Sequence, residues 1–232
     1  MISPATQLIY LHGFASGPQS AKAQYLQERW AERGTTMRIP DLNQDDFFHL
    51  SLTRQLQQVE AEFGSDTFRL RGFGSTAWGF ERPEQQILIG SSFGGLTAAW
   101  LATRGFPVDR MILLAPAFGF LEHWLPQLGQ EKLQQWQADG SLAVYHHIQQ
   151  QELPLGYEFV MDLARYDDTQ LRFSVPTLIL HGIQDEVIPI RASRDFAANR
   201  PNVRLIELDA DHSLGNVLPK VWQEIDSFMS NA

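Results

Sequence analysis

Short apolar runs recur along the chain at intervals of roughly 20 to 60 residues, with polar or glycine-rich segments between them. Six such runs occupy residues 8–11, 37–39, 87–89, 111–114, 177–180 and 203–206. A continuous apolar run of this length is typical of a strand that is buried on both faces of a sheet. The pattern therefore predicts six buried strands.

Segments with helical periodicity lie between several of these runs. Residues 52–63 and 218–228 carry apolar side chains spaced by three and four positions, and a third helix is expected to begin after Ser20, which can cap it, and to stop at Gly34. Strands that alternate with helices predict an α/β fold with a doubly wound, mainly parallel sheet of about six strands. One domain, residues 1–232, accounts for the whole pattern.

Two stretches interrupt this alternation. Residues 65–84 are rich in glycine and aromatic residues and are expected to form a loop insertion, whereas residues 117–173 are expected to form two or three helices with a hairpin near residues 143–153. Long excursions from an α/β sheet are commonly functional covers. We therefore interpret residues 117–173 as a small helical lid.

Composition and charge exclude several classes of function. The chain has 232 residues with 18 Lys and Arg against 27 Asp and Glu, so its net charge is −9, and no basic stripe suggests nucleic acid as a partner. The absence of cysteine excludes disulfides, thiolate metal sites and a cysteine nucleophile. No apolar stretch approaches the roughly 18 residues of a membrane span. We therefore expect a cytoplasmic protein with no membrane insertion, whose oligomeric state the sequence leaves open.

One motif carries the chemistry. Gly90-Ser91-Ser92-Phe93-Gly94 directly follows a predicted strand and opens a helix of small residues, which is the context that a G-x-S-x-G nucleophile elbow requires. So sharp a turn forces the serine backbone into strained angles, and side chains at positions 90 and 94 would clash with the helix. The sequence predicts Ser92 at the apex, with Ser91 pointing elsewhere.

A serine hydroxyl needs a base to take its proton and an acid to orient that base. In this architecture the partners follow in the order Ser, Asp or Glu, His, each after a later strand. Asp185 follows the run at 177–180, and His212 follows the last run. We therefore expect Ser92, Asp185 and His212 to form a catalytic triad.

Other residues compete for these roles. Asp185 is preferred over Glu186, and also over Asp209 and Asp211, which are too near His212 in sequence to reach its ring from the neighbouring strand. The remaining histidines are assigned to turns (His12, His181), to opposite faces of a strand rather than to a metal site (His146, His147), and to the lid or surface (His49, His123).

An acyl-transfer intermediate also needs two backbone N–H donors for its oxyanion. Phe93, the residue after the nucleophile, is expected to supply one. The loop after the first strand, His12-Gly13-Phe14, is expected to supply the other through the amide of Phe14.

These motifs together resemble the α/β-hydrolase superfamily. The residues that carry the resemblance are 11–14 (Leu-His-Gly-Phe), 90–95, 180–185 and 211–212, and the early His-Gly-Phe loop with the later Gly-Ser-Ser-Phe-Gly-Gly is similar to the small bacterial YqiA-like esterases. The resemblance implies hydrolysis of carboxylic esters, or of thioesters, without a metal or organic cofactor. It assigns Ser92 as nucleophile, His212 as base and then acid, and Asp185 as the group that orients the histidine.

Two departures from the superfamily pattern leave the substrate open: there is no His-Gly-Gly-Gly run, and residues 65–84 are inserted before the elbow strand. The apolar side chains of the lid, Phe118, Trp124 and Leu125 among them, have two interpretations. They either form a substrate pocket for a small or medium acyl group or pack the lid onto the core.

Other functions are compatible with the same triad or with the same fold. The same triad serves C–C hydrolases, peptidases, acyltransferases and perhydrolases, and a hydrolase fold can also act as a non-catalytic binding protein. Residues 72–77 match G-x-G-x-x-A, but the aromatic and proline-containing segment 78–83 after them cannot propagate a helix, so a nucleotide site is not expected there.

Overall fold

The computed structural model describes residues 6–64 and 85–230. The expected loop insertion at 65–84, and with it the G-x-G-x-x-A match at 72–77, lies outside the described residues.

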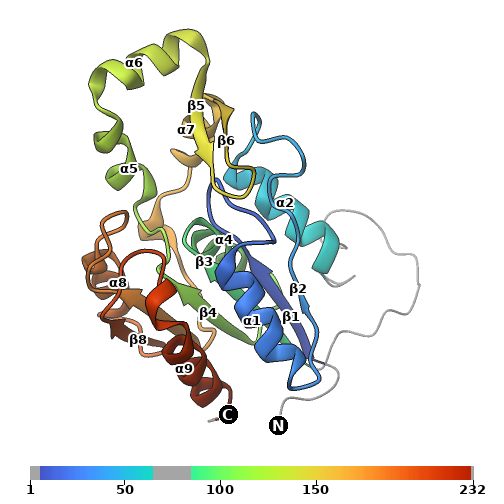
Figure 1. The fold of residues 1–232 in the computed structure, drawn as a ribbon. Helices are drawn as coiled ribbons and strands as arrows, with labels where there is room; N and C mark the ends of the chain where they lie inside the picture. The colour runs from blue at the N-terminus through green and yellow to red at the C-terminus, as the bar shows by residue number, and fades with distance from the viewer. Residues whose placement is uncertain (1–5, 65–84, 231–232) are drawn as a thin grey trace, which may run out of the picture.

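A six-stranded parallel sheet forms the centre of the molecule (Figure 1). Its strands lie in the order β2-β1-β3-β4-β7-β8. The bounds are Thr6–Leu11 (β1), Met37–Arg38 (β2), Gln85–Ser91 (β3), Arg110–Leu114 (β4), Thr177–Gly182 (β7) and Val203–Leu208 (β8). Each predicted apolar run lies in one of these strands, except that Ile39 is just beyond β2, so the α/β class and the parallel sheet are confirmed.

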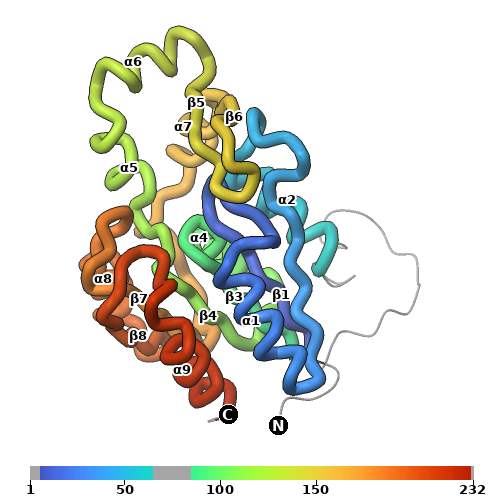
Figure 2. Tube along the Cα trace, in the orientation of Figure 1, coloured from blue at the N-terminus to red at the C-terminus, as the bar shows by residue number. Residues whose placement is uncertain are grey.

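Helices cover both faces of the sheet, as Figure 2 shows. α1 (Ala21–Ala31) and α9 (Leu218–Ser230) pack on one face, and α2 (Leu52–Phe63), α4 (Phe93–Thr103) and α8 (Ile190–Ala197) pack on the other. Adjacent strands are aligned so that Tyr10, Ile89 and Ile112 lie side by side and point into the core under α1 and α9. Each face therefore has its own apolar core, which explains why the strands read as unbroken apolar runs.

The helix ends differ in one detail from the expectation. Ser51 caps α2, because its hydroxyl accepts a bond of 3.1 Å from the amide of Arg54. Ser20 occupies the same position before α1 with an extended backbone, but its side chain makes no capping bond. The start of α1 is therefore placed correctly by the sequence, while the predicted cap is wrong.

Residues 117–173 form a separate layer beyond the end of the sheet where loops leave the strands, in the upper part of Figure 1. The layer contains helices α5 (Phe120–Leu128), α6 (Gln130–Asp139) and α7 (Glu158–Leu163) and the short helix η1 (Asp168–Gln170). Between α6 and α7 the antiparallel strands β5 (Ser141–His146) and β6 (Gln151–Gly156) form a hairpin. The hairpin spans residues 141–156, somewhat more than the expected 143–153, and the role of this segment as a lid stays a prediction.

A last short helix, η2 (Gly215–Val217), leads into α9. Among the described residues, no helix combines the length and the apolar character needed to cross a bilayer.

Candidate active site

The turn between β3 and α4 holds Ser92 in an unusual backbone conformation. β3 ends at Ser91, α4 begins at Phe93, and Ser92 between them has φ 52° and ψ −116°. A positive φ is rare for a residue other than glycine and is found at sites where the surrounding structure enforces it. Here the amide of Ser92 donates a bond of 2.8 Å to the carbonyl of Leu114, which anchors the turn on β4.

The two flanking glycines allow this turn to close. A Cβ at Gly90 would lie 2.4 Å from the carbonyl oxygen of Gly94, and a Cβ at Gly94 would lie 2.1 Å from that of Leu11. Neither position has room for a side chain. The local fold is thus the strained strand-turn-helix expected from the motif.

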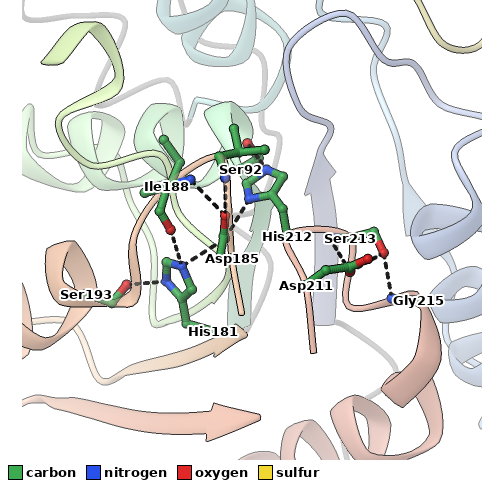
Figure 3. Close-up of polar contacts among 10 residues, drawn as sticks. Ser92, His181, Asp185, Ile188, Ser193, Asp211, His212, Ser213 and Gly215 are labelled. Carbon is green, nitrogen blue, oxygen red and sulfur yellow. Dashed lines mark hydrogen bonds and ion pairs between the residues drawn. The ribbon is translucent and has the colours of Figure 1, made fainter. Parts of the chain in front are cut away.

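Three side chains from three different loops meet at this turn (Figure 3). The Oγ of Ser92 lies 2.9 Å from the Nε2 of His212, and the Nδ1 of His212 lies 2.7 Å from the Oδ2 of Asp185. Since a carboxylate only accepts hydrogen bonds, Nδ1 carries the proton and Nε2 is free to accept from the serine hydroxyl. This arrangement can take a proton from Ser92 and hold the resulting imidazolium beside an anion.

The environment of Asp185 keeps its carboxyl group ionised. Its side chain has no exposed surface, and its Oδ1 accepts bonds of 2.9 and 2.8 Å from the amides of Val187 and Ile188. Burial alone would raise the pKa of Asp185, but hydrogen bonds from His181 and His212, the attraction of His212 and the Ile188 amide hold that pKa well below its usual range.

Hydrogen bonds of the preceding residue, Asp211, shape the loop that carries His212. Asp211 accepts bonds of 2.9 and 2.6 Å from the amide and hydroxyl of Ser213, and that hydroxyl in turn accepts from the amide of Gly215 at 3.1 Å. Asp209 is bonded to the side chain of Gln184 at 2.7 Å. Asp209 and Asp211 therefore stabilise the loops, and Asp185 is the carboxylate that bonds the ring of His212.

The loop after β1 passes directly beside the serine. A Cβ at Gly13 would lie 3.4 Å from the Cβ of Ser92, so the loop passes beside Ser92 immediately before Phe14. Phe93 is the first residue of α4, and an amide at that position has no acceptor within its own helix. The two expected oxyanion donors therefore belong to segments that border Ser92.

This loop is supported from two sides. The buried ring of His12 accepts a bond of 2.9 Å at Nε2 from the amide of Leu42, and the carbonyl of Ala15 accepts one of 3.0 Å from the amide of His147 in the β5–β6 turn. Ala15 has a positive φ of 48°. His12 thus holds the loop in place, in keeping with its interpretation as a turn residue.

The ring of Phe14 lies in an aromatic cluster that joins the core to residues 117–173. Its centroid is 5.1 Å from that of Trp124 and 5.3 Å from that of Phe159. Rings at 5.5 to 6.3 Å complete the cluster: Phe120, Phe47 and Phe93. The same residue therefore borders the serine with its backbone and the outer layer with its side chain.

A cavity of about 840 Å³ lies between α4, α8 and the segment after β4. Apolar side chains, Leu96, Phe118, Phe120, Leu163 and Phe196 among them, form much of its wall, and charged side chains complete it: Glu122, Asp167, Asp168, Arg191, Asp195 and Arg200. Leu96 is one turn along α4 from Ser92, and the amide of Ala117, next to Phe118, donates a bond of 3.0 Å to the carbonyl of Ser92. None of Ser92, Asp185 and His212 lines the cavity, which is linked to the serine only through the elements that carry Leu96 and Phe118.

The three expected pocket residues are placed differently from one another. Phe118 lines the cavity and stacks on Phe196 with ring centroids 4.1 Å apart. Trp124 instead packs edge-on against Phe14 and Trp136, and Leu125 packs against the core. The structure thus brings Phe118 to the cavity wall and directs Trp124 to the aromatic cluster.

Four other histidines make contacts that do not involve Ser92, Asp185 or His212. His146 is buried with Nε2 at 3.3 Å from the Asn43 amide, whereas the neighbouring ring of His147 contacts Tyr145. His49 is exposed beside Asp46, and His123 lines the cavity. Within residues 6–64 and 85–230, no group of three or more His, Cys, Asp or Glu side chains is placed to hold a metal ion.

One residue of the site was not found by sequence reasoning. His181, assigned there to a turn, is fully buried on β7, and its Nε2 lies 3.0 Å from the Oδ2 of Asp185 (Figure 3). One signal in the sequence could have indicated this contact. His181 precedes Asp185 by four residues, and a tight turn between them brings Asp185 back toward the end of β7.

A parallel sheet in this strand order, with a strained serine turn after β3 and an acid and a histidine after β7 and β8, defines the α/β-hydrolase fold. Solved structures of that fold match nearly the whole chain. Est1E from Butyrivibrio proteoclasticus with bound ferulic acid is 20% identical, with a TM-score of 0.76 over 99% of this chain and 90% of that one. Within the fold, the chain belongs to the Uncharacterised protein family (UPF0227), whose model matches residues 7–229. This membership confirms the resemblance to the YqiA-like proteins.

Two further structures extend the comparison. Alpha/beta hydrolase domain-containing protein 10 from mouse is 20% identical with a TM-score of 0.68, covering 97% of this chain and 90% of that one. The Pyrococcus furiosus esterase Pf2001 is 15% identical with a TM-score of 0.59, covering 99% and 83%. At these identities the likeness concerns the fold. Among curated protein sequences, none matches this chain.

Proposed function

We propose that the protein is a serine hydrolase that cleaves carboxylic esters, or thioesters, of small to medium acyl groups through an acyl-enzyme on Ser92. The observation that carries the proposal is the chain of contacts from the Ser92 Oγ through the His212 ring to Asp185, at 2.9 and 2.7 Å. The likeness of the fold to esterases supports it.

The first half of the reaction acylates the enzyme. As the Oγ of Ser92 attacks the carbonyl carbon, its proton moves to the Nε2 of His212, and the carbonyl electron pair moves onto oxygen. When the tetrahedral intermediate collapses, the bond to the leaving group breaks and His212 gives its proton to the departing alcohol or thiol. Asp185 holds the Nδ1 proton and stabilises the imidazolium throughout.

The second half returns the free enzyme. His212 takes a proton from a water molecule, whose oxygen attacks the acyl carbon, and the proton then passes to the Oγ of Ser92 as the carboxylic acid leaves. The backbone amides of Phe14 and Phe93 are the proposed donors to the oxyanion in both steps, because they border the serine and are fixed before the reaction.

The substrate pocket we propose is the cavity lined by Phe118, whose wall includes Leu96, four residues along α4 from Ser92. The cavity's apolar side chains and its volume of about 840 Å³ suit an acyl group of small or medium size. Residues 117–173 form one wall of this cavity and are the proposed lid of a single-domain enzyme. One structural neighbour, Est1E, holds ferulic acid, an aromatic carboxylic acid.

The test is hydrolysis of p-nitrophenyl esters of increasing acyl length, with the matching thioesters in parallel. Ser92→Ala should lower kcat by about 10⁴-fold or more, as for a residue that acts within a triad. Ser91→Ala is the matched control, since Ser91 is buried at the end of β3, and it should remain active. Absence of turnover, together with no labelling of Ser92 by a fluorophosphonate, would contradict the proposal and favour a binding protein.

A further inference from the structure

A second histidine contacts the carboxylate that holds His212. The Oδ2 of Asp185 lies 2.7 Å from the Nδ1 of His212 and 3.0 Å from the Nε2 of His181 (Figure 3). The two rings approach the same oxygen from different strands, His181 from β7 and His212 from the loop after β8. His181 and Asp185 have no exposed side-chain surface, so water does not compete for this contact.

The hydrogen-bonding partners of His181 fix its tautomer. Its Nε2 lies 3.0 Å from both the carbonyl oxygen of Ile188 and the Oδ2 of Asp185, and both of these atoms only accept. Nε2 therefore carries a proton and donates. On the other side of the ring, Nδ1 lies 2.7 Å from the hydroxyl of Ser193 on α8, which can donate to it. The ring is thus held at both nitrogens.

The contact completes the hydrogen bonding of Asp185. The Oδ1 accepts from the amides of Val187 and Ile188, and the Oδ2 accepts from His212 and lies 3.0 Å from the Nε2 of His181, whose single proton is shared with the carbonyl of Ile188. The carbonyl of Ile188 bonds His181 while its amide bonds Asp185, so the turn, the ring and the carboxylate form one closed network. A carboxylate held by three hydrogen bonds and the shared proton of His181 has little freedom to rotate away from His212.

From this geometry we infer that His181 is a positioning residue of the proposed hydrolase: it fixes the orientation of Asp185 and shares its negative charge, and so sets how strongly the carboxylate holds the protonated ring of His212. The inference rests on the proposed function for its effect on turnover. Its electrostatic part can be measured without any substrate.

The direction of the effect follows from the donor count. When the bond from His181 is lost, the negative charge on Asp185 is less stabilised and attracts the imidazolium form of His212 more strongly. His212 then keeps its proton to a higher pH, and activity begins at a higher pH. Other charges act on this network, namely Lys22 near Asp185, Asp211 near His212, and Glu207 near His181, and they stay in place in every variant.

Two substitutions separate the hydrogen bond from the volume of the ring. His181→Leu removes both nitrogens, whereas His181→Gln retains an N–H donor near the position of Nε2. His146→Leu is the matched control, because His146 is also a buried histidine but contacts Asn43 instead of the carboxylate. Each variant is checked for folding by circular dichroism and thermal unfolding.

The measurement is the NMR titration of the His212 ring, assigned by its loss in His212→Gln, with the pH dependence of kcat and KM for a p-nitrophenyl ester alongside. We expect His181→Leu to raise the titration midpoint by on the order of half a pH unit. It should also lower kcat by about tenfold with little change in KM, a loss near the lower end of that expected for a bond to a charged group. His181→Gln should return both values toward wild type, and His146→Leu should leave the midpoint unchanged.

An unchanged midpoint in folded His181→Leu, or a Gln variant no closer to wild type than the Leu variant, would overturn the inference. A shifted midpoint in a protein that hydrolyses no ester would uphold the positioning of Asp185 and reject the proposed function. If His181→Leu does not fold, Ser193→Ala replaces it: loss of the partner at Nδ1 should raise the midpoint in the same direction by a smaller amount, and no change there would also overturn the inference.

Discussion

The backbones of Gly94 and Leu11 touch: a Cβ at position 94 would lie 2.1 Å from the Leu11 carbonyl oxygen. This contact packs the first turn of α4 directly on the end of β1. Because β1 continues into the loop of Gly13 and Phe14, one close approach aligns the serine turn with the segment beside it.

Gly94→Ala is expected to destabilise the protein by more than about 3 kcal/mol, because the obstacle is backbone and cannot move aside as a side chain can. Gly34→Ala is the control. Unlike Gly94, Gly34 has a positive φ, 72°, and nothing lies near its missing side chain, so that variant should cost only the backbone strain of about 1 to 2 kcal/mol. Urea unfolding measures both, and equal costs would show that β1 and α4 can separate easily.

Ser92→Gly is expected to be more stable than Ser92→Ala by about 1 kcal/mol, although neither should turn over substrate. Both lose the bond to His212, but only glycine adopts φ 52° and ψ −116° without strain. At Ser91, within β3, the order should reverse and Ala should be the more stable residue. Thermal unfolding of the four variants decides the question, and a more stable Ala at position 92 would rule out stored strain there.

The stability that Asp185 contributes should vanish in acid. Its pKa is lowered in the folded protein, whereas an unfolded aspartate titrates near about 3.9. Below that pH the Asp185 carboxylate binds a proton in the unfolded chain but stays ionised in the folded protein, so the free energy of unfolding falls as pH falls. The difference in unfolding free energy between wild type and Asp185→Asn should therefore shrink from about pH 5 to about pH 3. A constant difference would mean that the carboxylate charge does not stabilise the fold.

Lys22 should show the opposite dependence. Burial lowers the pKa of Lys22 to about 8, although Asp185 and Asp211 attract its charge. An unfolded lysine titrates near about 10.4, so between these values only the unfolded chain holds the proton and stability rises with pH. Lys22→Met should therefore raise Tm by several degrees at neutral pH, and the gain should shrink toward about pH 10. Lys132→Met, at an exposed position on α6, should show no such trend in thermal unfolding scans.

Features with a local cause could be predicted from the sequence. The serine turn follows from glycines at fixed positions between a strand and a helix, and the sheet follows from unbroken apolar runs. The choice of Asp185 and His212 required only the chain order of loops at one end of a parallel sheet, and the structure brings both to Ser92.

Features that depend on how distant segments pack could not be predicted. The contact of His181 with Asp185 requires the turn at 185–188 to fold back on β7, and the bond from Leu42 to His12 joins residues 30 positions apart. The rotation of α5 about its axis decides that Trp124 contacts Phe14 and not the cavity. No pattern along the chain encodes that rotation, because both faces of α5 carry apolar residues.

The support of the Phe14 loop by the outer layer limits how this protein can be recombined. The amide of His147 bonds Ala15, and the rings of Trp124 and Phe159 pack on Phe14, so the segment 117–173 is not an interchangeable module. A chimera that receives this segment from a homologue must also inherit residues that match it in the 12–17 loop. The segment 117–173 and the geometry around Ser92 would then have to diverge together, in evolution and in the laboratory alike.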